Sequence, residues 1–169
     1  MDAPAPGEPG LFSAITADLQ GALGRDTAQI RLLLKRSPAQ AYARIVEIGR
    51  EVGARYGIKL VVNFPKEGRI EETQMYGRRD LSLIIDYSRK RFPIDRGIIK
   101  ARAVEMLGDV MTEDAYMYEN KEGVRVYTDS WKIDVLPHSF HVWTEFDPGV
   151  TAFCDWLMAD AYGLRAKPA

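Results

Sequence analysis

The spacing of apolar residues changes at Lys59, and this change limits the folds open to the chain. Before Lys59, apolar side chains recur every three or four residues, the spacing of helices that bury one face. After it, short runs of β-branched and aromatic residues lie between turn signals, which is typical of strands. The sequence therefore predicts an α+β fold: three N-terminal helices, an antiparallel sheet interrupted by one helix, and a C-terminal helix packed on the sheet.

Capping signals place the helix ends. Ser37 followed by Pro38 is the clearest start, because a serine N-cap accepts a backbone N–H and proline has no N–H to leave unpaired. Asp26 followed by Gln29 predicts a capping box. The predicted helices are 11–23, 27–36, 38–56, one after Asp95 that buries Ile99, Ala103, Met106, Leu107 and Val110, and one after Asp147 that buries Val150, Phe153, Cys154, Leu157, Met158 and Ala161.

The strands are predicted from short apolar runs that end at proline, glycine or asparagine. The last four runs are joined by connections too short for parallel crossovers, so they should form an antiparallel meander with a turn at Asn120–Gly123. The sequence therefore predicts a sheet of five to seven strands. The predicted strands are 60–64, a weak one at 70–75, 81–87, 115–119, 124–128, 131–136 and 139–146.

The 169 residues, 46% of them apolar and 28% charged, have the composition of one globular domain. Residues 1–10 contain three prolines and few side chains that could be buried, so we expect a flexible lead-in before a single domain at 11–169. Cys154 is the one cysteine and is expected in the core. The chain lacks a run of about 18 apolar residues, which favours a soluble, cytoplasmic protein without membrane contact.

Charge is unevenly distributed along the chain. Residues 66–102 hold 10 basic and 6 acidic side chains, whereas residues 103–169 hold 5 basic and 12 acidic ones. A basic segment at 78–102 is the feature that favours nucleic acid, because lysine and arginine neutralise phosphates. The candidate nucleic-acid-binding residues are Arg78, Arg79, Arg89, Lys90 and Arg91.

Aromatic residues are concentrated between residues 116 and 156, at a density that one small sheet and its covering helix would not fully bury. Aromatic side chains with a polar atom, surrounded by acids, make good anchors in protein interfaces. The candidate partner-binding residues are Tyr118, Trp131, Trp143 and Glu145. The alternative for both tryptophans is a place in the core.

Catalytic and metal-binding patterns are sparse. His138 and His141 are the candidate metal ligands, but the flanking alternation predicts a strand, which would send the two imidazoles to opposite sides. Asp80, Asp86 and Glu119–Lys121 have the residue types of a metal-dependent nuclease without its tight spacing. Motifs for a nucleophilic serine or for nucleotide phosphates are missing, so the sequence implies no cofactor and no catalytic residue.

These observations rank three functions. The first is a non-catalytic binding or adaptor domain that engages a protein partner, or its own copy in an oligomer, through an aromatic, acidic C-terminal surface. The second is a nucleic-acid-binding domain that uses the basic segment 78–102. The third is a metal-dependent nuclease or hydrolase.

Overall fold

The computed structural model describes residues 10–63, 82–86, 94–117, 120–128, 131–137, 139–143 and 148–163. The predicted lead-in before Gly10 and the weak strand at 70–75 lie outside these ranges. In chain order the elements are α1 (Leu11–Arg25), α2 (Thr27–Arg36), α3 (Pro38–Arg55), β1 (Lys59–Asn63), β2 (Ser82–Asp86), α4 (Arg96–Leu107), β3 (Met111–Met117), β4 (Asn120–Tyr127), β5 (Lys132–Val135), β6 (Ser139–Trp143), α5 (Pro148–Trp156) and the π-helical turn η2 (Leu157–Ala161). The predicted α+β fold is confirmed.

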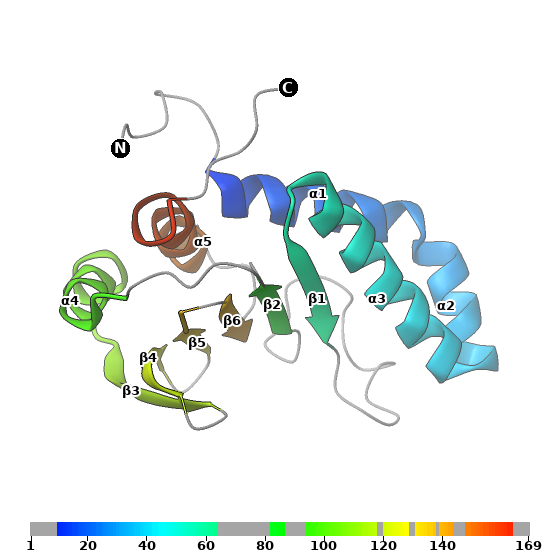
Figure 1. Ribbon diagram of the computed structural model, residues 1–169. Helices are drawn as coiled ribbons and strands as arrows, with labels where there is room; N and C mark the ends of the chain where they lie inside the picture. The colour runs from blue at the N-terminus through cyan, green and yellow to red at the C-terminus, as the bar shows by residue number, and fades with distance from the viewer. Residues whose placement is uncertain are drawn as a thin grey trace.

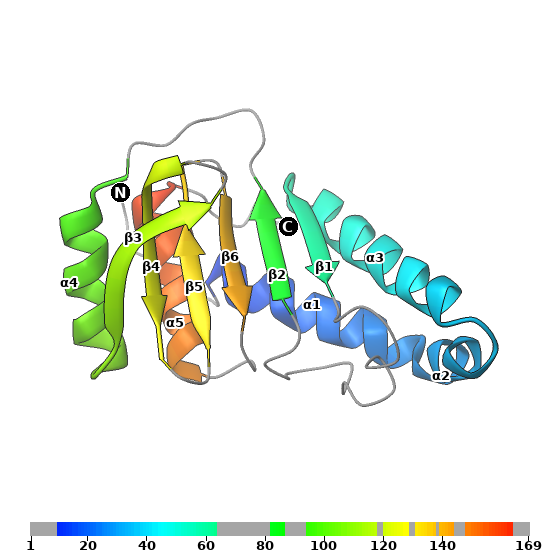
Figure 2. The ribbon, with the colours of Figure 1, turned by 90° about the horizontal axis from the view of Figure 1, so that it is seen from below.

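The strands form one antiparallel sheet in the order β1-β2-β6-β5-β4-β3. Figure 1 shows α1 and α5 on one side of this sheet, with α4 beside β3 and β4 and α3 beside β1. Figure 2, seen from below, has the strands in front and α1 and α5 behind them. We call the side of the sheet turned away from α1 and α5 the open face, because none of the described helices packs there.

Alternation along the strands divides core from open face, because successive side chains point to opposite sides of a sheet. The side facing the helices is apolar and buried, and antiparallel register places its members opposite one another. The sheet residues in this core are Leu60, Val62, Ile85, Val124, Val126, Ile133, Val135, Phe140 and Val142.

The start of α3 follows the predicted cap, whereas the start of α2 does not. Ser37 Oγ accepts a hydrogen bond from the backbone N–H of Gln40 at 3.4 Å. Asp26 makes no side-chain cap bond to α2, so the predicted capping box is wrong. The carboxylate of Asp26 instead accepts from Arg44 Nε at 2.7 Å, because a guanidinium on α3 offers a charge-assisted partner.

Two other local predictions need correction. The turn between β3 and β4 comes earlier than predicted, since Asn120–Gly123 already belongs to β4, and Ala115 pairs with Gly123. Met106 was placed on the buried side of α4, but its side chain is 36% exposed. Only Ile99 and Ala103 of α4 are buried, because this helix covers just the β3–β4 end of the sheet.

Helix α3 approaches β1 closely because two glycines lie at the contact. A Cβ on Gly49 would come within 2.7 Å of Val62 Cγ2, and a Cβ on Gly53 within 2.8 Å of the Leu60 backbone nitrogen. The chain then turns at Gly57, whose φ of 71° is in the left-handed region, and so enters β1.

Asp155 of α5 joins the C-terminal helix to the start of α1. Its Oδ1 accepts from the backbone N–H of Ser13 at 2.8 Å, and its Oδ2 accepts from the Ser13 hydroxyl. Gly10 lies against this carboxylate, leaving no space for a Cβ. Asp155 therefore serves as a cap for α1 from a distant part of the chain. Within the described residues, no helix is both long and apolar enough to span a membrane.

Candidate functional site

The open face carries two parallel rows of residues that run across the strands. In the outer row, Met111 of β3 pairs with Tyr127 of β4, which pairs with Lys132 of β5, which pairs with Trp143 of β6. Directly opposite residues of an antiparallel sheet share a face, so these four positions belong together. Met111 is 50% exposed and Tyr127 and Lys132 are half-buried.

The second row, which we call the polar row, consists of Glu113, Arg125, Asp134 and His141 in consecutive strands. Arg125 donates to Asp134 through Nε at 2.7 Å and through its second terminal nitrogen at 3.1 Å, a bidentate pair. Its first terminal nitrogen lies 3.7 Å from Glu113 Oε1. The hydrogen bond to Asp134 raises the pKa of Arg125, although partial burial opposes this effect.

Burial of the polar row increases toward the middle of the sheet. The side chain of Glu113 is 50% exposed, that of Arg125 27%, and that of Asp134 is fully buried. A buried carboxylate is stable only when it is paired, and Arg125 supplies that pairing for Asp134. The row therefore changes from solvated charge at the β3 edge to a buried ion pair beside β6.

His141 ends the polar row as a buried strand residue. Its Nε2 lies 3.4 Å from the Ser139 hydroxyl, two positions earlier on the same side of β6. The predicted strand around His141 is confirmed, and His138 lies outside the described residues. In the part of the chain that the structure describes, no three His, Cys, Asp or Glu side chains are grouped as metal ligands.

The predicted partner-binding residues are only partly described. Trp131 precedes β5, is half-buried and packs against the hydrophobic core, while its carbonyl accepts from the Thr128 N–H at 2.9 Å. Trp143 ends β6 at an open-face position beside Lys132. Tyr118 and Glu145 lie outside the described residues. The structure thus brings Trp143, but not Trp131, into the register of the outer row.

The basic segment 78–102 is described at 82–86 and from Ile94 onward. Arg78, Arg79, Arg89, Lys90 and Arg91 lie outside the described residues. Its remaining cations contact carboxylates. Arg96 lies 3.1 Å from Asp114 Oδ1 and Lys100 3.5 Å from the same atom, while Arg102 contacts Glu105 at 3.3 Å. These contacts neutralise the described end of the segment.

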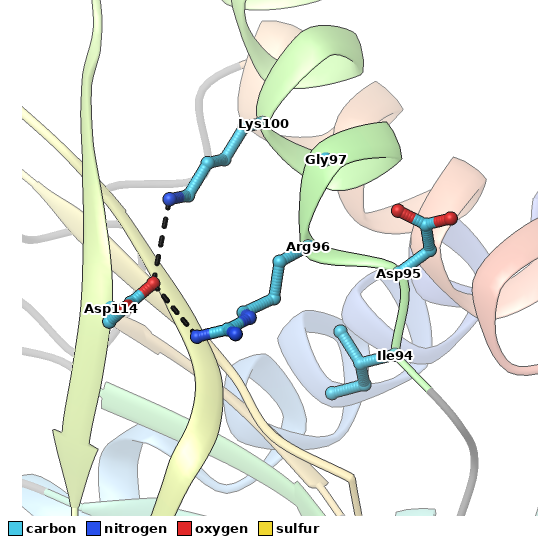
Figure 3. Close-up of a pocket in the computed structure, with 6 residues that line it drawn as sticks. All are labelled: Ile94, Asp95, Arg96, Gly97, Lys100 and Asp114. Atoms are coloured by element: carbon cyan, nitrogen blue, oxygen red, sulfur yellow. Dashed lines mark hydrogen bonds and ion pairs between the residues drawn. The ribbon is translucent and has the colours of Figure 1, made fainter.

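Arg96, Lys100 and Asp114 border an open cleft of ≈ 800 Å³ between the start of α4 and β3. Figure 3 shows the two cations reaching toward Asp114 from successive turns of α4, while Asp95 points away from them. The Asp95 carboxylate accepts from the Ile98 N–H at 3.0 Å and so caps the helix. Ile94 and Gly97 complete the lining. Both cations already contact Asp114, so the ion pairs at this cleft connect α4 to β3.

The described candidates for nuclease chemistry are not brought together. Asp86 lies on β2 and Lys121 on β4, with β6 and β5 between them in the sheet, whereas Asp80 and Glu119 lie outside the described residues. Cys154 is completely buried, and burial raises the pKa of its thiol well above the usual range. A thiol that is both buried and protonated is a poor nucleophile. The prediction that Cys154 belongs to the core is confirmed.

The polar row cannot be recognised from the sequence, because it depends on strand register. Arg125, Asp134 and His141 come from three strands, and their separation in the chain does not reveal that they lie opposite one another. A local signal was present: each is a polar residue flanked on both sides by apolar, buried ones, as Ile133 and Val135 flank Asp134. This alternation identifies the face but not the neighbours.

Comparison of the chain with protein-family models, with curated proteins and with solved structures found no match.

Proposed function

We propose that this protein is a non-catalytic binding domain that engages a protein partner through the open face of its sheet. The observation that carries the proposal is the one-sided packing of the sheet: α1 and α5 lie on one face, and the described helices leave the other face to the outer row and the polar row. A partner on that face would contact the exposed and half-buried side chains of β3, β4 and β5, among them Met111, Tyr127 and Lys132.

The residue types of the open face support a protein partner. Methionine, tyrosine, tryptophan and arginine are enriched in protein interfaces, and Met111, Tyr127, Trp143 and Arg125 occupy neighbouring register positions here. Met111 gives the outer row an exposed apolar side chain at the β3 edge. Arg125, which is 27% exposed and is held in place by the buried Asp134, would present a polar group to a partner beside it.

The charges of this face favour a protein over nucleic acid. Basic and acidic positions alternate within the polar row. A phosphate that approached the cation of this row would therefore be repelled by the neighbouring carboxylates. Both signs also occur elsewhere on this face, where Lys59 of β1 is paired directly with Asp86 of β2.

Charge substitution on the open face tests the proposal. In Met111→Arg, an exposed apolar contact is replaced by a cation without disturbing the core. Met106→Arg makes the same change on α4, where the side chain is 36% exposed, and serves as the control. Both variants should keep the melting temperature of the parent protein, since surface substitutions usually change stability by less than about 0.5 kcal/mol.

Binding is measured by sedimentation velocity of the purified protein, for self-association, and by affinity capture followed by mass spectrometry, for other partners. We expect Met111→Arg to weaken the association at least about fivefold, because truncating or charging an interface anchor costs more than about 1 kcal/mol. Met106→Arg should bind like the parent. Equal binding by parent, variant and control would contradict the assignment of the open face.

A further inference from the structure

Helix α2 presents a positively charged surface at the opposite end of the molecule from β3 (Figures 1 and 2). Its sequence from Thr27 to Arg36 contains three basic residues and no acid. Arg31, Lys35 and Arg36 are all exposed, and Arg25 at the end of α1 is exposed as well. We call these four residues the basic end: Arg25, Arg31, Lys35 and Arg36.

Several basic side chains of the protein are paired with acids, whereas among the described residues those of the basic end are not. Arg44, Arg96 and Arg125 each contact a carboxylate. Within the described part of the chain, no ion pair involves any member of the basic end. The nearest acid in the sequence, Asp26, is held by Arg44 at 2.6 Å. The four cations are thus available to an external anion.

The geometry of α2 places the charges on one side. Ile30 is buried and Leu33 and Leu34 pack against the core, so this side of the helix is turned into the molecule. Positions 31 and 35 are one helical turn apart, whereas position 36 lies about 100° further round the helix from position 35, with position 32 between them. The three cations of α2 are therefore spread around its outward half, together with Leu32, which is 47% exposed.

We infer that the basic end is a docking surface for the phosphate backbone of a nucleic-acid duplex. Unpaired, outward-pointing cations on one helix side are what phosphate neutralisation requires, and charge complementarity is the argument for this partner. Base reading is not implied: the neighbouring α3 exposes Glu47 and Glu51, which would repel the backbone of a groove that it entered. The contact should therefore be independent of base sequence.

Other anionic partners fit the same surface less well. Single strands are held by stacking on aromatic rings, and α2 has no aromatic residue. An anionic membrane would need an exposed apolar side, but the apolar side of α2 is turned inward and Leu32 is its one strongly exposed apolar residue. The centre of a protein interface is usually apolar or aromatic, whereas this surface consists of three arginines, one lysine and Leu32.

The test is the salt dependence of binding to a fluorescent duplex of about 20 base pairs, with DNA and RNA versions in separate arms. Each neutralised phosphate contributes about −0.9 to the slope of log K against log salt, so four contacts predict a slope of about −3.6. Replacing Arg31 and Lys35 by alanine should reduce the magnitude of this slope by about 2 and weaken binding at low salt.

The control is the pair Arg50→Ala and Arg55→Ala, which removes the same charge from exposed positions of α3 and should leave the slope unchanged. A second control, Leu32→Ser, should not affect duplex binding. Met111→Arg should also bind the duplex normally, so failure of the open-face proposal is distinguishable from failure of this one.

Three results would overturn the inference. One is the lack of duplex binding at about 50 mM salt, where a four-cation contact should be measurable. Another is an equal decrease in the salt-dependence slope of the α2 and α3 variants, which would mean that the duplex is attracted by the overall charge of the protein and not by α2. The third is tighter binding to polyglutamate or to vesicles containing phosphatidylserine than to either duplex, which would assign the surface to an acidic protein or to a membrane.

Discussion

Gly53 shows how a single position controls the contact between a helix and the sheet. A Cβ there would lie 2.7 Å from Leu60 Cβ, 2.8 Å from its nitrogen and 2.9 Å from the Ile58 oxygen. Two of these atoms belong to the backbone, so the added carbon could not be accommodated by a side-chain rotation. The short distance between α3 and β1 thus depends on the missing side chain.

We predict that Gly53→Ala lowers the free energy of unfolding by about 1–3 kcal/mol, the usual cost of overpacking a core. Gly24→Ala is the matched control, because nothing lies within 4 Å of its Cβ position in α1. That substitution should raise stability by up to about 1 kcal/mol, since alanine favours helix. Urea denaturation of the two variants checks both values, and equal stability would mean that α3 can move away from β1.

At the scale of elements, the open face is held in shape by the ion pair between β4 and β5. Arg125 is the bidentate partner of Asp134, whose side chain has no exposure to solvent. Removing the cation would leave a buried carboxylate without compensation, which costs far more than the loss of a solvated pair. This asymmetry makes the pair a sensitive test of the observed register.

We predict that Arg125→Ala lowers the free energy of unfolding by about 3–5 kcal/mol. The double variant Arg125→Met with Asp134→Leu should be more stable than that single variant, because neither charge then remains buried alone. Arg96→Ala is the control: its pair with Asp114 is about half exposed on both sides, so the loss should stay within about 1 kcal/mol. The midpoints of denaturant unfolding check these values. A loss of stability in Arg125→Ala as small as that in Arg96→Ala would mean that Asp134 is in contact with solvent.

For the whole molecule, one cluster of rings connects the two ends of the chain through the sheet. Phe140 of β6 lies 6.0 Å from Phe12 of α1 and 5.9 Å from Tyr162, measured between ring centroids. The Tyr162 hydroxyl donates to the Leu136 carbonyl at 2.8 Å, and burial raises the pKa of this phenol. The first helix, the last helix and the sheet should therefore unfold together.

We predict that Phe140→Ala destabilises the protein by about 3–5 kcal/mol, the range for a buried phenylalanine. Unfolding of the parent should give one transition with the same midpoint by far-ultraviolet circular dichroism and by tryptophan fluorescence. Val104→Ala, at a 54% exposed site on α4, should change the midpoint little. Separate transitions for the helical and fluorescent signals would show that the two ends of the chain fold independently.

The sequence by itself determined the elements and the core, because helix caps and apolar spacing act over a few residues. Ser37, Ile45 and Cys154 are in the roles that their local patterns predicted. Local patterns also placed Trp143 among the candidate binding residues, but they did not predict which residues lie beside it.

Only the tertiary structure decided which side chains meet across the sheet and which charges remain unpaired. Asp26 does not cap α2 as predicted but accepts a hydrogen bond from Arg44, 18 residues away, because folding brings this cation to it. Arg125, Asp134 and His141 became neighbours through strand register, and the cations of α2 stayed exposed because its apolar side was taken up by the core. Such long-range pairings depend on the packing of distant elements, which local spacing does not encode.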